Sequence, residues 1–338
     1  MIPIRRLALS ALAATALGLV GAAPAPADPV LAAAGDIACA PTSPFFFGGN
    51  GDATHCAQKR TAALIGAVNA VLPLGDNQYN TGSLTNYNAV FAKTWGVYKG
   101  ISFPVPGNHE YGSTGASGYF SYFGARAGTR GQGWYSFDLG GWHVLALNSE
   151  CNFIGTACNA GGAEEAWVRQ DLAAHPALCT LAFWHEPRFS SGSTIVTNAA
   201  AMAPIWNDLY DAGADLVLVA HKHSYERLAA LDKAGNVDNA RGMREIIVGT
   251  GGDDHAGRAL GRIGSQVRNF DSFGVLKLTM HPTGYDFQFV PEAGRVFTDA
   301  GSGTCHAGGT VAPAAAAQTV TKKPKKATPK VARTPLGG

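Results

Sequence analysis

Short apolar runs separated by amphipathic stretches make up most of the chain. Five of these runs have the length and side chains of buried strands, and each ends in polar residues: VLAAAGD, AVLPLGDNQY, ISFPVPGNHEY, CTLAFWHEP and DLVLVAHKH. Helical patterns lie between several of the runs, over residues 57–70, 85–95, 163–174 and 198–210. Strands that alternate with helices predict an α/β fold in which a sheet packs between helices.

The polar residues at the ends of the five runs are of types that bind metal ions. In chain order they are Asp36, Asp76, Tyr79, Asn108, His109, His185, His221 and His223. An α/β sheet carries its chemistry where strands end and loops begin. If the strands lie side by side, these groups therefore converge on one edge.

Seven of these residues, all except His109, are too many ligands for one tetrahedral zinc ion. They suit two ions that share a bridging carboxylate. A phenol ionises at neutral pH only beside a strong Lewis acid, and its hard oxygen suits ferric iron, so Tyr79 predicts Fe(III). The imidazoles and Asn108 suit a divalent partner: Zn, Mn or Fe(II). Such a pair of ions holds a phosphate and generates hydroxide near neutral pH, so we predict phosphoester hydrolysis.

The ordered motifs GD, GDNQY, GNHE, a histidine at a strand end and HKHSYER resemble those of the calcineurin-like metallophosphoesterases, specifically the purple acid phosphatase branch. The resemblance covers most of the chain between residues 30 and 298. It implies two packed mixed β-sheets flanked by helices. It also implies an enzyme that hydrolyses phosphate monoesters by attack of a metal-bound hydroxide.

The resemblance further assigns a role to each residue of the set. The ligands of the ferric ion would be Asp36, Tyr79 and His223. The ligands of the divalent ion would be Asn108, His185 and His221. Asp76 would bridge the two ions, and His109 would contact the phosphoryl group or protonate the leaving oxygen.

Two positions depart from the pattern that is usual in this family. Ala220 stands where the family has Gly before the last His-x-His, which would alter the backbone path. Glu186 directly follows the strand-end histidine and would place a carboxylate in the pocket. Arg188 and His255 are candidate substrate contacts near the expected mouth of the site, and an ordinary packing or turn role is the alternative for each.

The two ends of the chain differ from its middle. Residues 1–27 combine two arginines, an apolar run and a small-residue cleavage site, which predicts a secretory signal peptide; a short N-terminal anchor is the alternative. Residues 310–338 form an Ala-, Pro- and Lys-rich basic stretch without aromatic residues, which predicts a disordered tail. Residues 28–309 are then the metallophosphoesterase domain of a secreted protein without a membrane span. The tail either has no partner or contacts an anionic surface such as cell-wall polymer.

The distribution of charge argues against nucleic acid as a specific partner. The whole chain has a net charge of +2, but eight of its 26 basic residues lie in the predicted signal peptide and tail. The remaining 18 basic residues face 24 acidic ones, which gives the folded part a net charge of about −6. An acidic domain does not attract a polyanion, so we expect a small phosphorylated substrate instead.

The six cysteines all lie in the predicted folded part. An even number in an exported chain predicts disulfide bonds, although several connectivities are possible. Spacing favours Cys39 with Cys56 and Cys151 with Cys158, which leaves Cys179 with Cys305. A thiolate metal site is the alternative, but the chain has no Cys-x-x-Cys pair to support it.

Three functions are compatible with these motifs. A broad-range, secreted phosphomonoesterase is the leading interpretation. A phosphodiesterase or nucleotide hydrolase would use the same two metals and differ only in its pocket loops. A cell-surface binding protein with a structural metal centre is the third, and the complete ligand set together with His109 argues against it.

Overall fold

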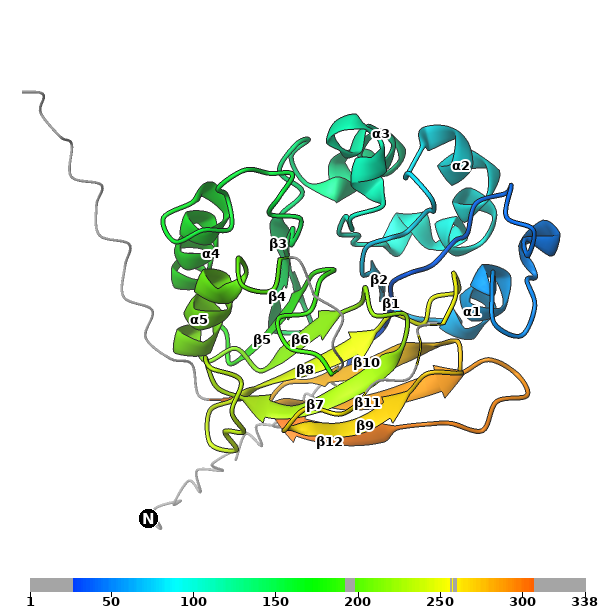
Figure 1. Ribbon diagram of the computed structural model, residues 1–338. Helices are drawn as coiled ribbons and strands as arrows, with labels where there is room; N and C mark the ends of the chain where they lie inside the picture. Colours follow the sequence, from blue (N-terminus) through cyan, green and yellow to red (C-terminus); the bar gives the residue numbers. More distant parts are fainter. Residues whose placement is uncertain (1–26, 192–197, 256, 258–259, 307–338) are drawn as a thin grey trace, which may run out of the picture.

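The computed structural model describes residues 27–191, 198–255, 257 and 260–306. The predicted tail, and all but the last residue of the predicted signal peptide, lie outside the described residues. Two mixed β-sheets pack against each other, and helices flank them (Figure 1). This is the architecture that the motifs imply.

The smaller sheet has five strands in the order β12-β11-β10-β1-β2. Their bounds are β1 Val30–Ala34, β2 Ala70–Pro73, β10 Gly274–His281, β11 Gly284–Pro291 and β12 Ala300–Thr304. Strand β1 is parallel to β2 and antiparallel to β10. The first strand of the described chain therefore pairs with the C-terminal hairpin, which closes the fold.

The larger sheet has seven strands in the order β3-β4-β5-β6-β8-β7-β9. Their bounds are β3 Tyr135–Leu139, β4 Trp142–Ala146, β5 Cys179–Phe183, β6 Leu216–Val219, β7 Tyr225–Leu231, β8 Met243–Val248 and β9 Ser265–Asn269. The four central strands β4, β5, β6 and β8 are parallel. Every residue of β4, β5 and β6 is buried, because both faces of a parallel sheet are covered.

Alternate residues of these strands enter two different apolar layers. Leu216 and Leu218 of β6 belong to the core that lies between the sheets, whereas Val217 and Val219 pack toward the helices. The helix layer includes Trp206, which is fully buried. Burial of each such side chain contributes about 2 kcal/mol.

The helices differ in how closely they follow the sequence prediction. Their bounds are α1 Gln58–Ile65, α2 Leu84–Ala89, α3 Ser117–Phe123, α4 Ala163–Ala174 and α5 Ala203–Ala212. The α4 helix matches its predicted range, but α1 ends five residues earlier than predicted, where Gly66 has a φ of 63°. The predicted 85–95 helix stops at Ala89, the 198–210 helix begins late, and α3 was not predicted.

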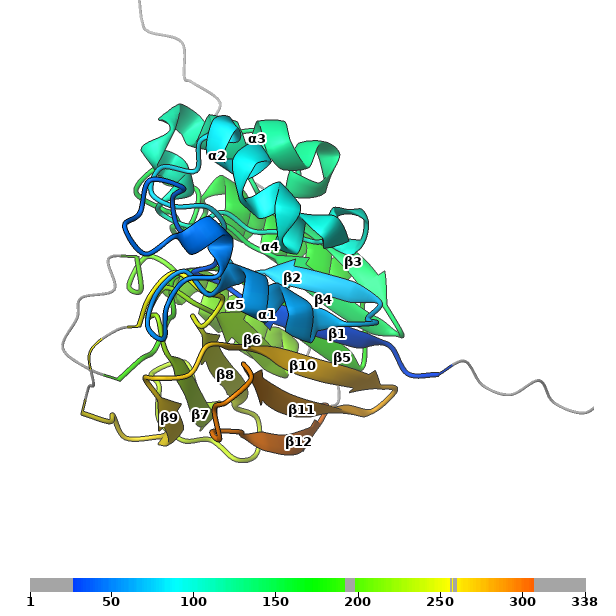
Figure 2. The ribbon, with the colours of Figure 1, turned by 90° about the vertical axis from the view of Figure 1, so that its right-hand side faces the viewer.

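Short 3-10 helices fill several connections between these elements. Their bounds are Phe47–Gly49, Phe91–Lys93, Trp95–Ile101, Glu110–Gly112, Thr114–Ala116 and Gly124–Ala127. Figure 2 shows α1 against the five-stranded sheet, with α2 and α3 gathered beyond β2. Among the described residues, we find no helix with the length and apolar character that crossing a bilayer requires.

One of the five apolar runs does not form the strand that was expected. The run at 101–105 forms only isolated parallel bridges, Val71 to Ser102 and Leu74 to Val105, because the chain there follows the edge strand β2 without joining the sheet fully. The remaining runs also divide between the sheets, with β1 and β2 in one and β5 and β6 in the other. The site therefore lies where two sheets meet, and not on the edge of one.

Three disulfides connect the cysteine pairs that spacing favoured. Cys39–Cys56 and Cys151–Cys158 each close a short loop, and Cys179–Cys305 ties β5 to the end of β12 across 126 residues of sequence. Neither of the two short loops lies within a strand or an α-helix. Each disulfide therefore closes a connection that has no regular backbone hydrogen bonding.

Candidate metal centre

Five loops bring seven polar side chains together. Four of the loops follow β1, β2, β5 and β6, and the fifth is formed by residues 107–109. Asp36, Tyr79 and His223 form one group, which we call the tyrosine half. The Tyr79 hydroxyl lies 2.9 Å from Asp36 Oδ1 and 2.9 Å from His223 Nε2. His223 Nε2 is also 3.4 Å from Asp36 Oδ1, so three donor atoms face one point.

The second group, the asparagine half, consists of Asn108, His185 and His221. Asn108 Oδ1 lies 3.3 Å from His185 Nε2 and 3.0 Å from His221 Nδ1. The two imidazole nitrogens are 3.2 Å apart. Only one of two such nitrogens can hold the proton of a hydrogen bond, whereas a shared cation satisfies both lone pairs.

Asp76 connects the two halves through a single oxygen. Its Oδ2 lies 3.1 Å from the Tyr79 hydroxyl and 3.2 Å from His185 Nε2. The other oxygen, Oδ1, accepts a hydrogen bond from the backbone N–H of His109 at 2.8 Å. The carboxylate is therefore oriented so that one oxygen is available to both halves.

Four of the seven residues have a backbone conformation that side chains other than glycine rarely adopt. The φ angles are 56° at Asp36, 47° at Asp76, 68° at His221 and 44° at His223. Such conformations cost free energy and persist where surrounding structure holds them, which occurs most often at functional sites. The sharp turns at the strand ends are therefore required to aim these side chains inward.

Ala220 fits the backbone without the glycine that is usual in the family. Its φ is not in the left-handed region, and its N–H donates to the carbonyl of His185 at 2.9 Å. The opposing position is Gly35, where an added Cβ would lie only 2.4 Å from the Cβ of Ala220. The close contact between these two loops therefore has its glycine at position 35, after β1, and not at position 220.

Burial shapes the electrostatics of the cluster. Asp36 and Asp76 are at most 1% exposed. Desolvation raises the pKa of Asp36, whereas for Asp76 the neighbouring His185 overcomes desolvation and holds the pKa well below its usual range. Desolvation and the charge of Asp36 raise the pKa of Tyr79 well above 10, so only a strong cation at this point could ionise the phenol.

The residues present fit a pair of metal ions. A buried carboxylate oxygen needs a hydrogen-bond donor or a cation, and the buried Asp36 Oδ2 has no hydrogen-bond partner among the described residues. His185 Nδ1 donates to the carbonyl of Leu74 at 2.9 Å, which leaves the Nε2 lone pair directed at the cluster. The tyrosine half is richer in hard oxygen donors, and the asparagine half is richer in imidazoles. A hard metal ion suits the first set and a borderline ion suits the second.

A family model described as Calcineurin-like phosphoesterase matches residues 44–225, more than half of the chain. The chain belongs to the calcineurin-like phosphoesterase family. The matched segment begins after Asp36, so the family match does not include this residue. The tertiary structure places it beside Tyr79 and His223.

The relatives found by sequence are purple acid phosphatases and an acid phosphatase. Purple acid phosphatase 15 of Arabidopsis thaliana is 27% identical over 223 residues, 54% of this chain and 40% of that protein. Human acid phosphatase type 7 is 28% identical over 225 residues, 55% of this chain and 49% of that protein. The chain thus matches less than half the length of either relative. Both agree with the predicted branch of the calcineurin-like phosphoesterases.

A solved structure supports the fold. Purple acid phosphatase PPD1 from seeds of yellow lupin (Lupinus luteus) superposes with a TM-score of 0.64 at 15% sequence identity. The similarity covers 82% of this chain and 54% of the lupin protein. Similarity to the purple acid phosphatases implies a dinuclear metal centre, which agrees with the two halves described above.

Two carboxylates that support the site were missed at the sequence level. Asp254 pairs with Nδ1 of His223, and with Asp36 it raises the pKa of that imidazole to about 9 although burial acts in the opposite direction. A carboxylate behind a histidine fixes the ring and makes its other nitrogen a better ligand. In the GTGGDDH stretch the sequence points to His255 as a substrate contact or to a glycine turn, and not to Asp254, because a strand-end carboxylate has many possible roles.

Glu110 is the second of these carboxylates. It is fully buried, and it accepts hydrogen bonds from the backbone N–H groups of Asn77, Gln78 and Gly107 and from the Tyr87 hydroxyl. These bonds connect the loop that carries Asp76 and Tyr79 to the loop that carries Asn108. The GNHE motif includes this residue, so the signal was present in the sequence.

His109 lies at the edge of the cluster. Its Nδ1 donates to the Asn80 carbonyl at 2.7 Å, and its ring lies 4.3 Å from that of Tyr79. The other nitrogen, Nε2, is 3.9 Å from Asp76 Oδ2 and faces the site. One third of the side chain is exposed, so the imidazole is partly accessible from solvent.

The three weaker candidates make other contacts. Glu186 does not line the pocket as expected, because its carboxylate accepts two hydrogen bonds from Asn198, at 2.7 and 2.9 Å. The guanidinium of Arg188 lies over the Phe189 ring, and none of its described contacts is to the seven-residue cluster. His255 stacks on Phe273, and both of its ring nitrogens are buried. A substrate role for Arg188 or His255 stays a prediction.

Proposed function

We propose that this protein is a secreted dinuclear-metal phosphatase that hydrolyses phosphate monoesters. The observation that carries the proposal is the meeting of two donor groups around one shared oxygen, Asp76 Oδ2. A single structural metal would need only one of these groups. Two adjacent ions are the arrangement that phosphoryl transfer uses to hold a phosphate and its nucleophile together.

In this proposal the tyrosine half would hold Fe(III) and the asparagine half would hold Zn, Mn or Fe(II). Asp76 would be the ligand that both ions share. The bound ions supply Lewis-acid charge, which neutralises phosphate oxygens and makes water nucleophilic near neutral pH. The chain's contribution is to fix the donor atoms in advance, through strained turns and the hydrogen bonds of Glu110.

His109 is the proposed general acid. Water oxygen forms a bond to phosphorus while the bond from phosphorus to the ester oxygen breaks, so the products are inorganic phosphate and an alcohol. The leaving oxygen needs a proton, and His109 Nε2 faces the site while Nδ1 is held by the Asn80 carbonyl. That hydrogen bond fixes which nitrogen is presented to the substrate.

Metal analysis together with visible absorption tests the ligand assignment. We expect two metal ions per chain, with iron bound by the tyrosinate, which gives a visible charge-transfer band. Tyr79→Phe should abolish the band while the fold is retained. A colourless, fully active protein that contains only zinc would show that the phenol is not an iron ligand.

The reaction class is tested with p-nitrophenyl phosphate and its bis ester. We expect the monoester to be hydrolysed with the larger kcat/KM. Faster cleavage of the bis ester would replace the proposal with a phosphodiesterase or nucleotide hydrolase. No hydrolysis of either ester by protein that carries both metals would favour a binding role.

Export is part of the proposal. The three disulfides are compatible with an oxidising compartment, where such bonds persist. N-terminal sequencing of protein from the culture medium should begin at Asp28. Retention of residues 1–27 on cell-associated protein would contradict a cleaved signal peptide.

A further inference from the structure

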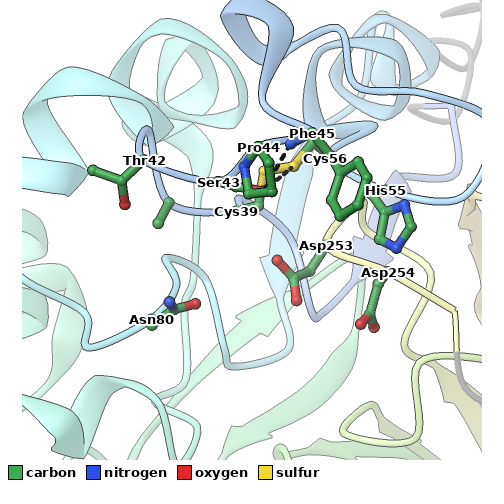
Figure 3. A pocket seen from close by; sticks show the side chains of 11 residues that line it. Cys39, Thr42, Ser43, Pro44, Phe45, His55, Cys56, Asn80, Asp253 and Asp254 are labelled. Atoms are coloured by element: carbon green, nitrogen blue, oxygen red, sulfur yellow. Dashed lines mark hydrogen bonds between the residues drawn. A yellow bond between two sulfur atoms is a disulfide. The ribbon is translucent and has the colours of Figure 1, made fainter.

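An open pocket of about 400 Å³ lies beside the tyrosine half. Its walls are the loop closed by the Cys39–Cys56 disulfide, Asn80 after β2, and the adjacent Asp253 and Asp254 after β8. Figure 3 shows Asn80, Asp253 and Asp254 below the disulfide-closed loop, with Asp253 between the other two. The pocket has no role in the proposed chemistry described so far.

The pocket adjoins residues that support His109 and His223. Asn80 lines it, and the carbonyl of the same residue holds His109, the proposed proton donor to the leaving oxygen. Asp254 lines it as well and is paired with His223. Ligand atoms of His223, Asp253 and Asp254 lie within 4.8 Å of one another. The pocket therefore lies next to the tyrosine half.

Among the described residues, the ionisable side chains of the pocket wall are two carboxyl groups and the imidazole of His55, which lies 3.1 Å from Asp52. Of the described residues that line the pocket, two are aspartates and none is Lys or Arg. No hydrogen bond is described for the Asp253 carboxylate among the residues that the structure covers, and the residue is half-buried. Burial, with the charges of Asp254 and Asp36, raises its pKa to about 8, so a cation beside it would favour the ionised form. Two arginines in the neighbourhood are directed elsewhere: Arg60 binds Glu292 at 2.6 Å, and Arg295 binds the Ala53 carbonyl at 2.5 Å.

An aromatic ring completes the pocket. Phe45 lines it, is 38% exposed, and stacks on His55 with ring centroids 4.0 Å apart. The face of an aromatic ring attracts an ammonium group, and the attraction is stronger for a quaternary ammonium that is weakly hydrated. Carboxylates next to an aromatic ring form a site for an organic cation, and they repel a second anionic group on the substrate.

We infer that this pocket binds the leaving group of the substrate and selects phosphate monoesters of amino alcohols, in which an ammonium group lies a few bonds from the ester oxygen. The inference rests on the proposed phosphatase function. Asp253 is the specificity-determining residue, because it lines the pocket and no hydrogen bond of its carboxylate is described. Asp254 is already paired with His223, and Phe45 contributes most to a methylated ammonium.

Three esters of two-carbon alcohols test the inference: O-phosphoethanolamine, 2-hydroxyethyl phosphate and 2-phosphoglycolate. They differ mainly in a positive, neutral or negative terminal group. For the metal-loaded protein we expect kcat/KM to decrease in that order, with about a tenfold ratio between the first and the last. Asp253→Asn should lower this ratio to about threefold or less. The change in the ratio cancels the intrinsic reactivity of the esters and any general loss of activity in the variant.

The matched control is Asp211→Asn, which removes a carboxylate that is paired with Lys233 outside the pocket. It should leave the ratio unchanged. If Asp253→Asn does not fold, Phe45→Ala provides the second variant, and it should lower kcat/KM for phosphocholine more than for 2-hydroxyethyl phosphate. Equal rates for the three esters, or a ratio that Asp253→Asn does not change, would overturn the inference.

A binding measurement separates this inference from the proposed function. Choline and its uncharged isostere 3,3-dimethylbutan-1-ol are compared by saturation-transfer NMR with the same protein. We expect a signal for choline that Asp253→Asn weakens, and a much smaller one for the isostere. If p-nitrophenyl phosphate is not hydrolysed but choline still binds in this way, the proposed function fails and the pocket assignment stands. If p-nitrophenyl phosphate is hydrolysed but choline and the isostere bind equally, only the pocket assignment fails.

Discussion

The two halves of the candidate metal centre are built from different chemistry. The tyrosine half has a carboxylate, a phenol and one imidazole, and its histidine is supported by the carboxylate of Asp254. The asparagine half has an amide and two imidazoles, and His185 is supported by a neutral carbonyl, that of Leu74. Negative charge is therefore concentrated on one side of Asp76.

This asymmetry shows how one fold can hold two unlike ions a short distance apart. Hard anionic oxygens favour a trivalent ion, whereas imidazole nitrogens favour a borderline divalent one. The difference extends to the groups behind the ligands, because a carboxylate raises the basicity of the histidine it supports more than a carbonyl does. The following experiments separate the two halves, in decreasing order of expected effect.

Removal of the shared ligand should abolish the function of both halves. Asp76→Ala is expected to lower kcat/KM for p-nitrophenyl phosphate by about three orders of magnitude, because neither ion keeps its full set of donors. Metal content per chain should decrease in the same samples. If the variant retains full activity with a normal circular dichroism spectrum, the chemistry does not occur at this centre.

Stepwise removal of metal should distinguish one half from the other. A chelator such as dipicolinate is expected to extract the ion of the asparagine half first, because neutral donors hold a divalent ion less tightly than anionic donors hold Fe(III). Activity should then be lost while the visible band remains. The measurement is absorption and activity on the same sample during dialysis, followed by readdition of zinc. Loss of the band before activity would reverse our assignment of the halves.

Glu110 tests whether the two halves share one support. Glu110→Ala leaves three backbone N–H groups and a tyrosine hydroxyl without their acceptor, so we expect the free energy of unfolding to decrease by about 3 kcal/mol. Urea unfolding of the metal-free protein gives this value. Glu165→Ala removes a buried carboxylate of α4 and serves as the comparison for a change outside the site. Equal costs for both variants would mean that Glu110 is an ordinary buried carboxylate.

Asp254 tests the support of the tyrosine half alone. Asp254→Asn keeps the shape but removes the charge behind His223, so iron affinity should decrease by about tenfold. The charge-transfer band should shift, since the electron density on the iron changes. The affinity of the asparagine half for zinc, measured by competition with a chromophoric chelator, is expected to stay within about twofold. An equal loss in both halves would indicate that Asp254 acts through the fold and not through His223.

The sequence was a good guide to local chemistry and a poorer guide to geometry. Strand-end motifs selected Asp36, Tyr79 and His223, since each motif keeps its residues within a few positions of a buried run, and the structure brings the three side chains together. Their role as metal ligands stays a prediction. The run at 101–105 carries the same apolar signal but does not form a full strand, because apolar content reports burial and not hydrogen-bond pairing. Helix ends were also missed. The α1 helix ends before Gly66 because of the positive φ of that residue, although the helical pattern of apolar residues continues beyond it.

Side chains that contact the site from distant parts of the chain could not be predicted. Asp254 reaches His223 because the turn after β8 folds beside the end of β6, and nothing in the spacing of these residues requires it. Glu186 shows the opposite case, because its place next to His185 suggested a pocket residue, but its carboxylate is bound to Asn198. A side chain's direction depends on which partners the whole fold places within reach.

The sequence by itself determined the types of donor atoms and the order in which the chain delivers them, because these are covalent properties. It also determined the alternation of strands and helices, since the period of apolar residues differs between the two. Only the tertiary structure decided that the site lies between two sheets, that Asp76 is shared by two halves, and that Asp253 faces an open pocket. These features depend on distances between segments far apart in the chain, and such distances are set by packing of the whole domain.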